Sequence, residues 1–481
     1  MKSPAIAFAA LAALAASSSA TPVDPCELRF NRLASRRFVL DNDLTLSEYL
    51  PDKVVASVQH PPAAFDPSLA WVGAWYPCTH CSADVAAVAP GASVKIAAAS
   101  PDGAVRAVFA AKPGEPIEGS GSRFAVPAPP FRFSVLMTGG GAEFCITKDG
   151  RTRYHGRRPY GGGTGDWREK SRAGTCKVYA GGQGVKLTRA AVALTAGYGQ
   201  ADVRFVTTGR DKRLYFENGR VFFTFSARGA GAMGVASFDP TLFDVRLEGA
   251  ILFDAGDGLL RSDGPADLYY DEPSGEWRAW VCNFSTVVST NGFLTGRAKG
   301  GVNVARSVRS PLHGLSVMRE RSLGLDGMNE DPTAFYDAAA GMWRMFLSEF
   351  TGGGIRGSLW EASAWDGPYR RLTPPTKEDS TGQCLAAVGG RRWALAGSAD
   401  RACHVYEYPS LRLHGDLKFD FPPWNDECPN GRVWATLAEL PDGFPFKYIF
   451  LTMDRACFPD IPRPNWTYGA LHYYAAKERK E

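Results

Sequence analysis

The sequence lacks three features that would each define a class of protein. After the first twenty residues it has no apolar run of roughly 18 residues, the length that a membrane-spanning helix needs. It has no long run of charges of one sign, and its 54 lysines and arginines nearly balance its 50 aspartates and glutamates. It also has no serine, glycine or proline tract that would serve as a linker. These absences exclude a multi-span membrane protein and a disordered chain, and they argue against nucleic acid or a membrane as a partner.

The sequence is rich in residues that favour short strands and turns. Its 481 residues include 52 glycines and 33 prolines, and aromatic residues make up 12% of the chain. Glycine and proline occur at turns, and aromatic residues are enriched in β-strands. We therefore predict an all-β fold, and the hydrophobic share of 45% is that of an ordinary globular protein.

The first twenty residues have the pattern of a secretory leader. Lys2 precedes an alanine-rich apolar stretch, and the small residues 17–20 follow as a cleavage site. We predict a signal peptide over residues 1–20 and a secreted, extracellular, monomeric protein. Two glycosylation motifs begin at Asn283 and Asn465. All ten cysteines follow the leader, and an even number in an oxidising compartment predicts disulfides, whose pairing the spacing leaves open.

Internal repetition is the most informative pattern in the chain. Residues 266–284 and 332–350 align with an identical tyrosine, aspartate, glycine, tryptophan and arginine at matching positions. Each copy predicts a strand, an Asp/Gly turn and a second strand that begins with Trp-Arg, which is the pattern of a β-hairpin. Weaker copies of this pattern occur in the segments 100–110, 144–154, 213–226, 385–398 and 441–452.

Repeated small antiparallel sheets are typical of a β-propeller, in which blades pack face to face around a central channel. The length of the chain suggests seven blades, with five as the second choice. Because no linker divides the chain, we predict one domain over residues 21–481. The segment Leu471–Ala475 is expected to complete a blade that begins near the N-terminus. The alternative is a β-sandwich with repeated hairpins.

In a propeller, the segments just before each innermost strand and just after each second strand are expected to form the ligand face. Polar residues at these points mix arginines with carboxylates and amides, which suits an anionic sugar. The alternative is that individual side chains form salt bridges between blades. The residues are Arg210, Asp211, Lys212, Arg213, Arg228, Asp267, Asn283, Asn329, Glu330, Asp331, Glu349, Asp400, Arg401, Asp454 and Arg455.

Several stretches give the chain a resemblance to a known group. The stretches are DGMNEDPTAFYDAAAGMWRMFLSEF, LWEASAWDGPYRRLT, SADRACHVYEYP, CPNGRVWATLAEL and NWTYGALHYYAA, and the similarity extends over roughly 200–475. The sequence resembles the secreted propellers of polysaccharide lyase family 42 and glycoside hydrolase family 145, which are similar in fold to the ulvan lyases. The resemblance implies a seven-bladed propeller that acts on the L-rhamnose-α-1,4-D-glucuronate ends of plant gums and arabinogalactan.

The resemblance also implies site residues for a β-eliminating lyase. Related lyases use two histidines near the N-terminus, and His60 and His80 stand at a similar spacing here. Tyr154 is assigned as a possible acid or base. Arginine neutralises the uronate carboxylate, a role that we give to Arg168 and Arg228. The polar residues Arg210, Asn283 and Arg401 are assigned to substrate binding.

Other functions remain open on the sequence alone. A hydrolase would use paired carboxylates, for which Asp267, Asp331, Glu349 and Asp400 are available. A glycan-binding propeller without catalysis is a third possibility. No cofactor is required, although a structural Ca²⁺ in the central channel is compatible with a propeller; no EF-hand loop occurs. The pair Cys78-x-x-Cys81 is weak support for zinc, and a disulfide partner for each is favoured.

Overall fold

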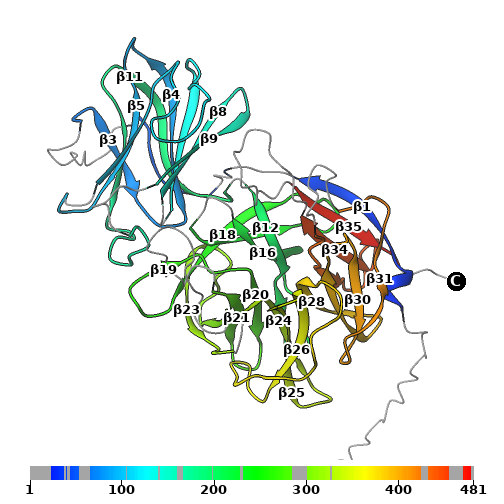
Figure 1. Ribbon diagram of the computed structural model, residues 1–481. Helices are drawn as coiled ribbons and strands as arrows, with labels where there is room; N and C mark the ends of the chain where they lie inside the picture. Colours follow the sequence, from blue (N-terminus) through cyan, green and yellow to red (C-terminus); the bar gives the residue numbers. More distant parts are fainter. Residues whose placement is uncertain are drawn as a thin grey trace, which may run out of the picture.

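The computed structural model describes residues 23–36, 40, 44–53, 66–103, 106–138, 141–159, 166–197, 199–227, 231–283, 301–325, 328–423, 432–453 and 470–477. Apart from one 3-10 turn, η1 (Pro25–Glu27), every regular element in these ranges is a strand (Figure 1). The all-β prediction is therefore confirmed. Among these residues, no helix has the length and apolar character that a membrane crossing requires.

The strands between Thr45 and Leu194 form two sheets that face each other (Figure 1, upper left). The first sheet consists of β3 (Leu69–Ala74), β10 (Lys177–Gly181), β5 (Val94–Ala99) and β6 (Arg106–Ala111). The second consists of β2 (Thr45–Tyr49), β11 (Val185–Leu194), β4 (Thr79–Val88), β7 (Phe131–Thr138), β8 (Gly141–Lys148) and β9 (Arg151–Pro159). We call this unit the sandwich.

The sandwich has a hydrophobic core of its own. Buried side chains from both sheets form one cluster, which includes Ile96, Phe109, Phe133 and Phe144. Alternating side chains of a strand point to opposite faces, so each strand supplies every second residue to this core. A core that closes without propeller strands makes the sandwich a separate packing unit.

The strands from Gln200 onward, together with β1 (Arg29–Arg36), form five antiparallel blades (Figure 1). Blade 1 consists of β12 (Gln200–Phe205), β16 (Arg220–Ala227), β17 (Met233–Phe238) and β18 (Arg246–Asp254). Blade 2 consists of β20 (Ala266–Asp271), β21 (Glu276–Cys282), β22 (Val302–Ser307) and β23 (Gly314–Ser322). Blade 3 consists of β24 (Asn329–Asp337), β25 (Met342–Thr351), β26 (Gly354–Ala362) and β27 (Arg370–Arg371).

The last two blades complete the ring. Blade 4 consists of β28 (Thr381–Val388), β29 (Arg391–Gly397), β30 (Cys403–Glu407) and β31 (Arg412–Asp416). Blade 5 consists of β33 (Leu437–Glu439), β34 (Tyr448–Met453), β35 (Leu471–Ala476) and β1, with β32 (Lys418–Phe419) beside β1. The parallel pairing of β18 with β23 joins blades 1 and 2 into one sheet. Short strands extend this sheet: β13 (Thr207–Thr208), β14 (Arg213–Leu214), β15 (Phe216–Glu217) and β19 (Leu260–Arg261).

Blade 5 joins the two ends of the propeller. Strand β35 pairs antiparallel with β34 on one side and with β1 on the other. The predicted closure by a C-terminal strand is thus confirmed. Pairing a late strand with an early one removes two exposed sheet edges, because each edge satisfies the backbone groups of the other.

Both the blade count and the domain boundaries differ from the first prediction. The described strands form five blades rather than seven, which was the second of the two counts. The predicted hairpins at 100–110 and 144–154 do exist, but they correspond to β5–β6 and β8–β9 of the sandwich. A hairpin pattern in the sequence predicts that two neighbouring strands pair, but it does not predict which sheet the hairpin belongs to. A single propeller over residues 21–481 is therefore corrected to a sandwich followed by a propeller.

The disulfide prediction is not borne out in the part of the chain that the structure describes. Eight of the ten cysteines lie there, and all eight are free thiols. Seven of them are buried. Cys78 and Cys81 belong to two different core clusters, so the Cys78-x-x-Cys81 pair does not form one site. Cys428 and Cys457 lie outside the described residues.

Candidate functional site

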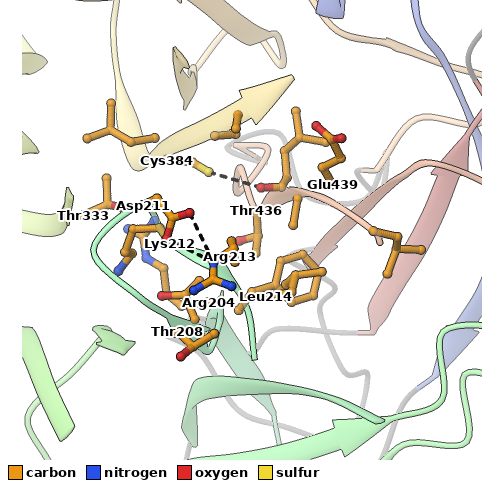
Figure 2. Close-up of a pocket in the computed structure, with 18 of the residues that line it drawn as sticks. Arg204, Thr208, Asp211, Lys212, Arg213, Leu214, Thr333, Cys384, Thr436 and Glu439 are labelled. Atoms are coloured by element: carbon orange, nitrogen blue, oxygen red, sulfur yellow. Dashed lines mark hydrogen bonds and ion pairs between the residues drawn. The ribbon is translucent and has the colours of Figure 1, made fainter. Parts of the chain in front are cut away.

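A cavity of about 630 Å³ lies in the central channel of the propeller (Figure 2). The innermost strand of every blade contributes to its wall. The contributors include Arg204 of β12, Asp267 of β20, Thr333 of β24, Cys384 of β28 and Leu437 of β33. Since every blade contributes at least one residue, the cavity lies on the axis of the ring.

The exposed part of the cavity wall comes from the connections between first and second strands. Asp211 and Arg213 lie in the connection of blade 1, and Asp442 lies in that of blade 5. All three are exposed. The cavity therefore opens on the face opposite to the one predicted from the sequence, because these connections lie at the far ends of the inner strands.

Arg204 closes the inner end of the cavity and holds four blades together. Its guanidinium donates to the carbonyl oxygens of Gln383 and Asp331 and lies 4.8 Å from the Trp434 ring centroid. The residue is 4% exposed. Among the described residues its Nε has no hydrogen-bond partner, and neither has the Oγ1 of Thr207, which also lines the cavity. Buried polar atoms that lack a protein partner normally form hydrogen bonds with water or a ligand.

A buried ion pair lies next to Arg204. The Lys212 Nζ is 2.6 Å from the Asp267 Oδ1, and the two side chains are 6% and 5% exposed. The second oxygen of Asp267 accepts the Ala334 amide at 2.8 Å. Burial lowers the pKa of Lys212, and the cations of Arg204 and Arg392 act in the same direction, whereas the Asp267 carboxylate raises it.

Arg392 supplies the third cation of the cavity. It donates to the carbonyl oxygen of Asp211 at 2.8 Å and lies 4.2 Å from the Phe335 ring centroid. Burial lowers the pKa of this guanidinium as well. Because its partner at Asp211 is a neutral carbonyl, the positive charge of Arg392 is not neutralised by that contact.

The charges of the cavity are divided between its interior and its rim. The interior has three cations, Arg204, Lys212 and Arg392, against the single carboxylate of Asp267. The rim has three carboxylates and two cations, which are Asp211, Glu439, Asp442, Arg213 and Lys447. An anionic group is therefore favoured inside, and carboxylates at the rim can accept hydrogen bonds from hydroxyl groups. The interior does not fit Ca²⁺, which requires six to eight oxygen ligands and would face three cations here.

Two predicted catalytic residues lie in the sandwich and not in the cavity. His80, on β4, is 1% exposed, and burial lowers its pKa to about 3. Tyr154, on β9, is 8% exposed, and its hydroxyl donates to the Glu143 carboxylate. A catalytic acid or base must reach the substrate, and neither side chain is placed to do so in this conformation. His60, the other predicted histidine, and Arg228 lie outside the described residues.

The other predicted binding residues are distributed around the molecule. Arg168 forms an ion pair with Asp166 at 2.7 Å, where the sandwich meets the propeller, and its carbonyl accepts the Leu260 amide. Arg210 pairs with Asp271 of blade 2 at 3.0 Å, and its carbonyl oxygen accepts the Tyr336 amide of blade 3.

Two further residues that were predicted to bind substrate also lie outside the cavity lining. Asn283, 1% exposed, donates to Asn303 at 3.2 Å. Arg401 lies in the turn after β29, where its amide bonds to Ser398. The structure brings neither these two residues nor Arg168 and Arg210 into the cavity lining.

The carboxylates proposed for hydrolysis are engaged in structural contacts. Asp331 accepts the Thr381 hydroxyl at 2.9 Å and the Gly382 amide at 3.0 Å. Glu349 accepts from Ser358, Trp360 and Arg371 on neighbouring strands. Asp400 lies in an exposed turn and accepts the Ala402 amide. The alternative in which Asp331 holds backbone amides agrees with these contacts.

Replacing Asp331 with alanine is expected to lower the free energy of unfolding by about 1–3 kcal/mol, because two buried donors lose their acceptor. Urea unfolding followed by tryptophan fluorescence would measure the change. Asp400→Ala, which removes a similar acceptor at an exposed turn, is the matched control and should change stability by less than about 1 kcal/mol. Equal losses in the two variants would contradict the assignment of Asp331 as a buried cap.

Sequence reasoning identified part of the cavity and missed the rest. Asp211, Lys212, Arg213 and Asp267 were among the predicted polar residues, although on the wrong face. Arg204 and Arg392 were missed. The available signal for Arg204 was its place between the apolar residues Val203 and Phe205, since an arginine buried in a strand requires hydrogen-bond partners.

The fold and cavity define a five-bladed propeller with a cation-lined axial site, preceded by a sandwich. No family model matches the sequence, and no curated protein matches it. Similar solved structures include a thermostable family-43 glycoside hydrolase, with 13% identity, a TM-score of 0.39, and coverage of 58% of this chain and 89% of the other.

Two further structures belong to other glycoside hydrolase families. The catalytic domain of the GH62 alpha-L-arabinofuranosidase of Coprinopsis cinerea has 11% identity and a TM-score of 0.38, over 58% of this chain and 90% of the other. A family 117 glycoside hydrolase of the marine bacterium Zobellia galactanivorans has 10% identity and a TM-score of 0.39, over 58% and 84%. At these values the likeness carries no inference about substrate or reaction.

Proposed function

We propose that this protein is a secreted carbohydrate-active enzyme that binds an acidic saccharide in the axial cavity and cleaves it by β-elimination. The observation that carries the proposal is the interior charge, with Arg204, Lys212 and Arg392 against one carboxylate. A uronate places its carboxylate on the ring that also carries hydroxyl groups. The carboxylate would lie inside, and the hydroxyls would lie toward Asp211 and Glu439 at the rim.

Elimination from a uronate needs a cation beside the carboxylate and a base for the proton on C5. Arg392 and Arg204 meet the first need, because their guanidinium groups stabilise the charge that develops as the C5 proton leaves. Lys212 is the proposed base in the form in which its ammonium proton has passed to the Asp267 carboxylate, 2.6 Å away. Burial favours this neutral pair, because it lowers the pKa of Lys212, and the cations of Arg204 and Arg392 remain for the substrate carboxylate. The amine takes the C5 proton, the C4–C5 double bond forms, the C4–O4 bond breaks, and water protonates the leaving oxygen.

Hydrolysis is the second candidate reaction, and fewer side chains of the cavity are available for it. Both oxygens of Asp267 already have partners, in Lys212 and the Ala334 amide. Glu439 lies 3.2 Å from Lys447, a contact that also occupies a rim carboxylate. A carboxylate pair flanking a glycosidic bond would have to be released from these contacts first.

The specific substrate proposed is the rhamnosyl-glucuronate end of plant gum or arabinogalactan, on the basis of the sequence resemblance. The test incubates the full chain with such a disaccharide and follows free rhamnose and the ultraviolet absorbance of a 4,5-unsaturated uronate in one sample. Rhamnose with absorbance supports elimination. Rhamnose without absorbance replaces elimination by hydrolysis. Binding without either product replaces the enzyme by a glycan-binding protein.

A matched pair of arginines tests the role of the cavity. Arg392→Gln is expected to lower kcat/KM by about 100-fold or more, since a charge-stabilising contact in an enclosed site is worth roughly 3 kcal/mol. Its neighbour Arg391 is exposed and lies against the Trp393 ring instead, so Arg391→Gln should stay within about twofold. Equal activity in the two variants, measured with the same disaccharide, would place the active site elsewhere.

A further inference from the structure

Three metal-ligating side chains meet at the seam between the N-terminal turn and blade 4. They are Asp24 and Cys26, which flank the start of η1, and His414 of β31. One ligand atom from each lies within 4.8 Å of the other two. The Nε2 of His414 is 2.9 Å from the Asp24 Oδ2. This cluster lies outside the axial cavity and plays no part in the proposed reaction.

The separations suit a tetrahedral metal. Zinc bonds of about 2.0–2.3 Å place neighbouring tetrahedral ligands roughly 3.3–3.7 Å apart. One pair here is 2.9 Å apart and all three atoms lie within 4.8 Å, so the separations would change by up to about 1 Å when the atoms share one ion. The other oxygen of Asp24 accepts the Cys26 amide at 2.8 Å, which fixes the turn that presents both residues. The Asp24 Oδ2 contacts the His414 Nε2 at 2.9 Å, a hydrogen bond that the ion would replace.

Two side chains lie beside the His414 ring. The Glu407 carboxylate is 3.8 Å from its Nδ1, beyond hydrogen-bond distance, and accepts from Arg412. A small movement would bring it to the position from which a carboxylate orients a ligating imidazole. The Trp393 ring lies 4.9 Å from the imidazole centroid and restricts its orientation.

Space for the thiolate is provided by the residue after His414. A Cβ placed on Gly415 would lie 2.9 Å from the Cys26 sulfur. Any larger residue would therefore force the sulfur or the strand to shift. The glycine leaves the three ligand atoms facing one another, with no side chain from position 415 between them.

We propose that Asp24, Cys26 and His414 bind one Zn²⁺ or a similar borderline divalent ion, with water in the fourth position. A thiolate, an imidazole and a carboxylate together favour Zn²⁺ or Co²⁺ over Ca²⁺ and Mg²⁺, which take oxygen ligands. The ion ties the N-terminal turn to the outer strand of blade 4. Because β1 follows this turn and completes blade 5, the site braces the closure of the ring.

The test titrates the chelator-treated full chain with Co²⁺ and records its absorption spectrum. One Co²⁺ per chain with a thiolate-to-cobalt charge-transfer band supports the site, and the band should be absent from Cys26→Ser. His414→Gln should weaken Co²⁺ binding at least about tenfold. The matched control is His313→Gln, because His313 faces Glu217 at 2.7 Å and Glu248 at 3.4 Å without a thiol among those contacts.

The outcomes separate clearly. No charge-transfer band in the wild type, or a band that survives Cys26→Ser, overturns the proposal. Unchanged affinity in His414→Gln also overturns it. If Cys26→Ser fails to fold, the Co²⁺ affinity of His414→Gln tests the proposal instead. His414 is exposed, and its replacement leaves the Cys26 thiol in place. Circular dichroism of each apo variant establishes that it is folded.

Discussion

Replacing Lys212 with methionine is expected to lower the free energy of unfolding by about 3–5 kcal/mol. The change leaves the Asp267 carboxylate, whose side chain is 5% exposed, with the Ala334 amide as its remaining partner among the described residues. Removing one member of a buried ion pair is strongly destabilising because the remaining charge is uncompensated. Urea unfolding at neutral pH, followed by tryptophan fluorescence, measures the loss.

A second variant distinguishes the lost pair from simple loss of packing. Lys212→Met combined with Asp267→Asn removes both charges, and the asparagine oxygen still accepts the Ala334 amide. The double variant should recover most of the lost stability. Lys95→Met is the matched control, because its partner Asp66 is at a similar distance, 2.8 Å, but the two side chains are 32% and 18% exposed. That variant should lose less than about 1 kcal/mol. A similar loss at both sites would show that burial does not set the size of the effect.

The same substitution also tests the proposed reaction. Without the amine, Lys212→Met has no base for the C5 proton, so turnover should fall far more than affinity for the substrate. The double variant should remain inactive although its stability returns. Activity that returns together with stability would remove Lys212 from the proposed mechanism while leaving its structural role intact.

Lowering the pH is expected to destabilise the sandwich through His80. Its pKa falls from about 6.5 to about 3 on burial, so the unfolded chain binds a proton in this range that the folded chain does not. The free energy of unfolding therefore decreases as the pH falls below about 6.5 and levels off near 3. The full window is worth about 4–5 kcal/mol, of which about 2 kcal/mol is lost by pH 5.

The measurement compares urea unfolding at about pH 7.5 and about pH 5 for the wild type and for His80→Leu. The variant should lack this part of the pH dependence, whatever its stability at neutral pH. His313→Gln, in which the lost histidine is half-exposed, should keep it. The assignment fails if wild type and His80→Leu lose the same free energy between the two pH values, because the buried imidazole would then take up no proton on unfolding.

Local strand pairing could be predicted from the sequence because its causes are local. The repeated Tyr-Asp and Trp-Arg segments fold as the hairpins β20–β21 and β24–β25, in which Tyr270 pairs with Trp277 and Tyr336 with Trp343. Turn residues and alternating aromatic side chains determine such pairing over about a dozen residues. The closing strand β35 was also predictable, because it is apolar and aromatic and an isolated strand needs partners.

The composition of the site was predictable only in part. Lys212 and Asp267 were expected to face a ligand, yet they form an ion pair across two blades at the end of the channel that the sequence did not indicate. Arg204 was missed because its partners, the carbonyl oxygens of Gln383 and Asp331, are more than one hundred residues away. The sequence pattern within a strand does not indicate hydrogen-bond partners that are so distant along the chain.

The sequence by itself determined the all-β class, the hairpins and the closure of the ring, because turn chemistry and the alternation of side chains act between near neighbours. Only the tertiary structure decided which hairpins became blades and which formed a sandwich, since that choice depends on which apolar faces bury one another. It also decided the site. The cations of Arg204, Lys212 and Arg392 come from separate strands, and their common charge acts on one cavity only once the blades close around the axis.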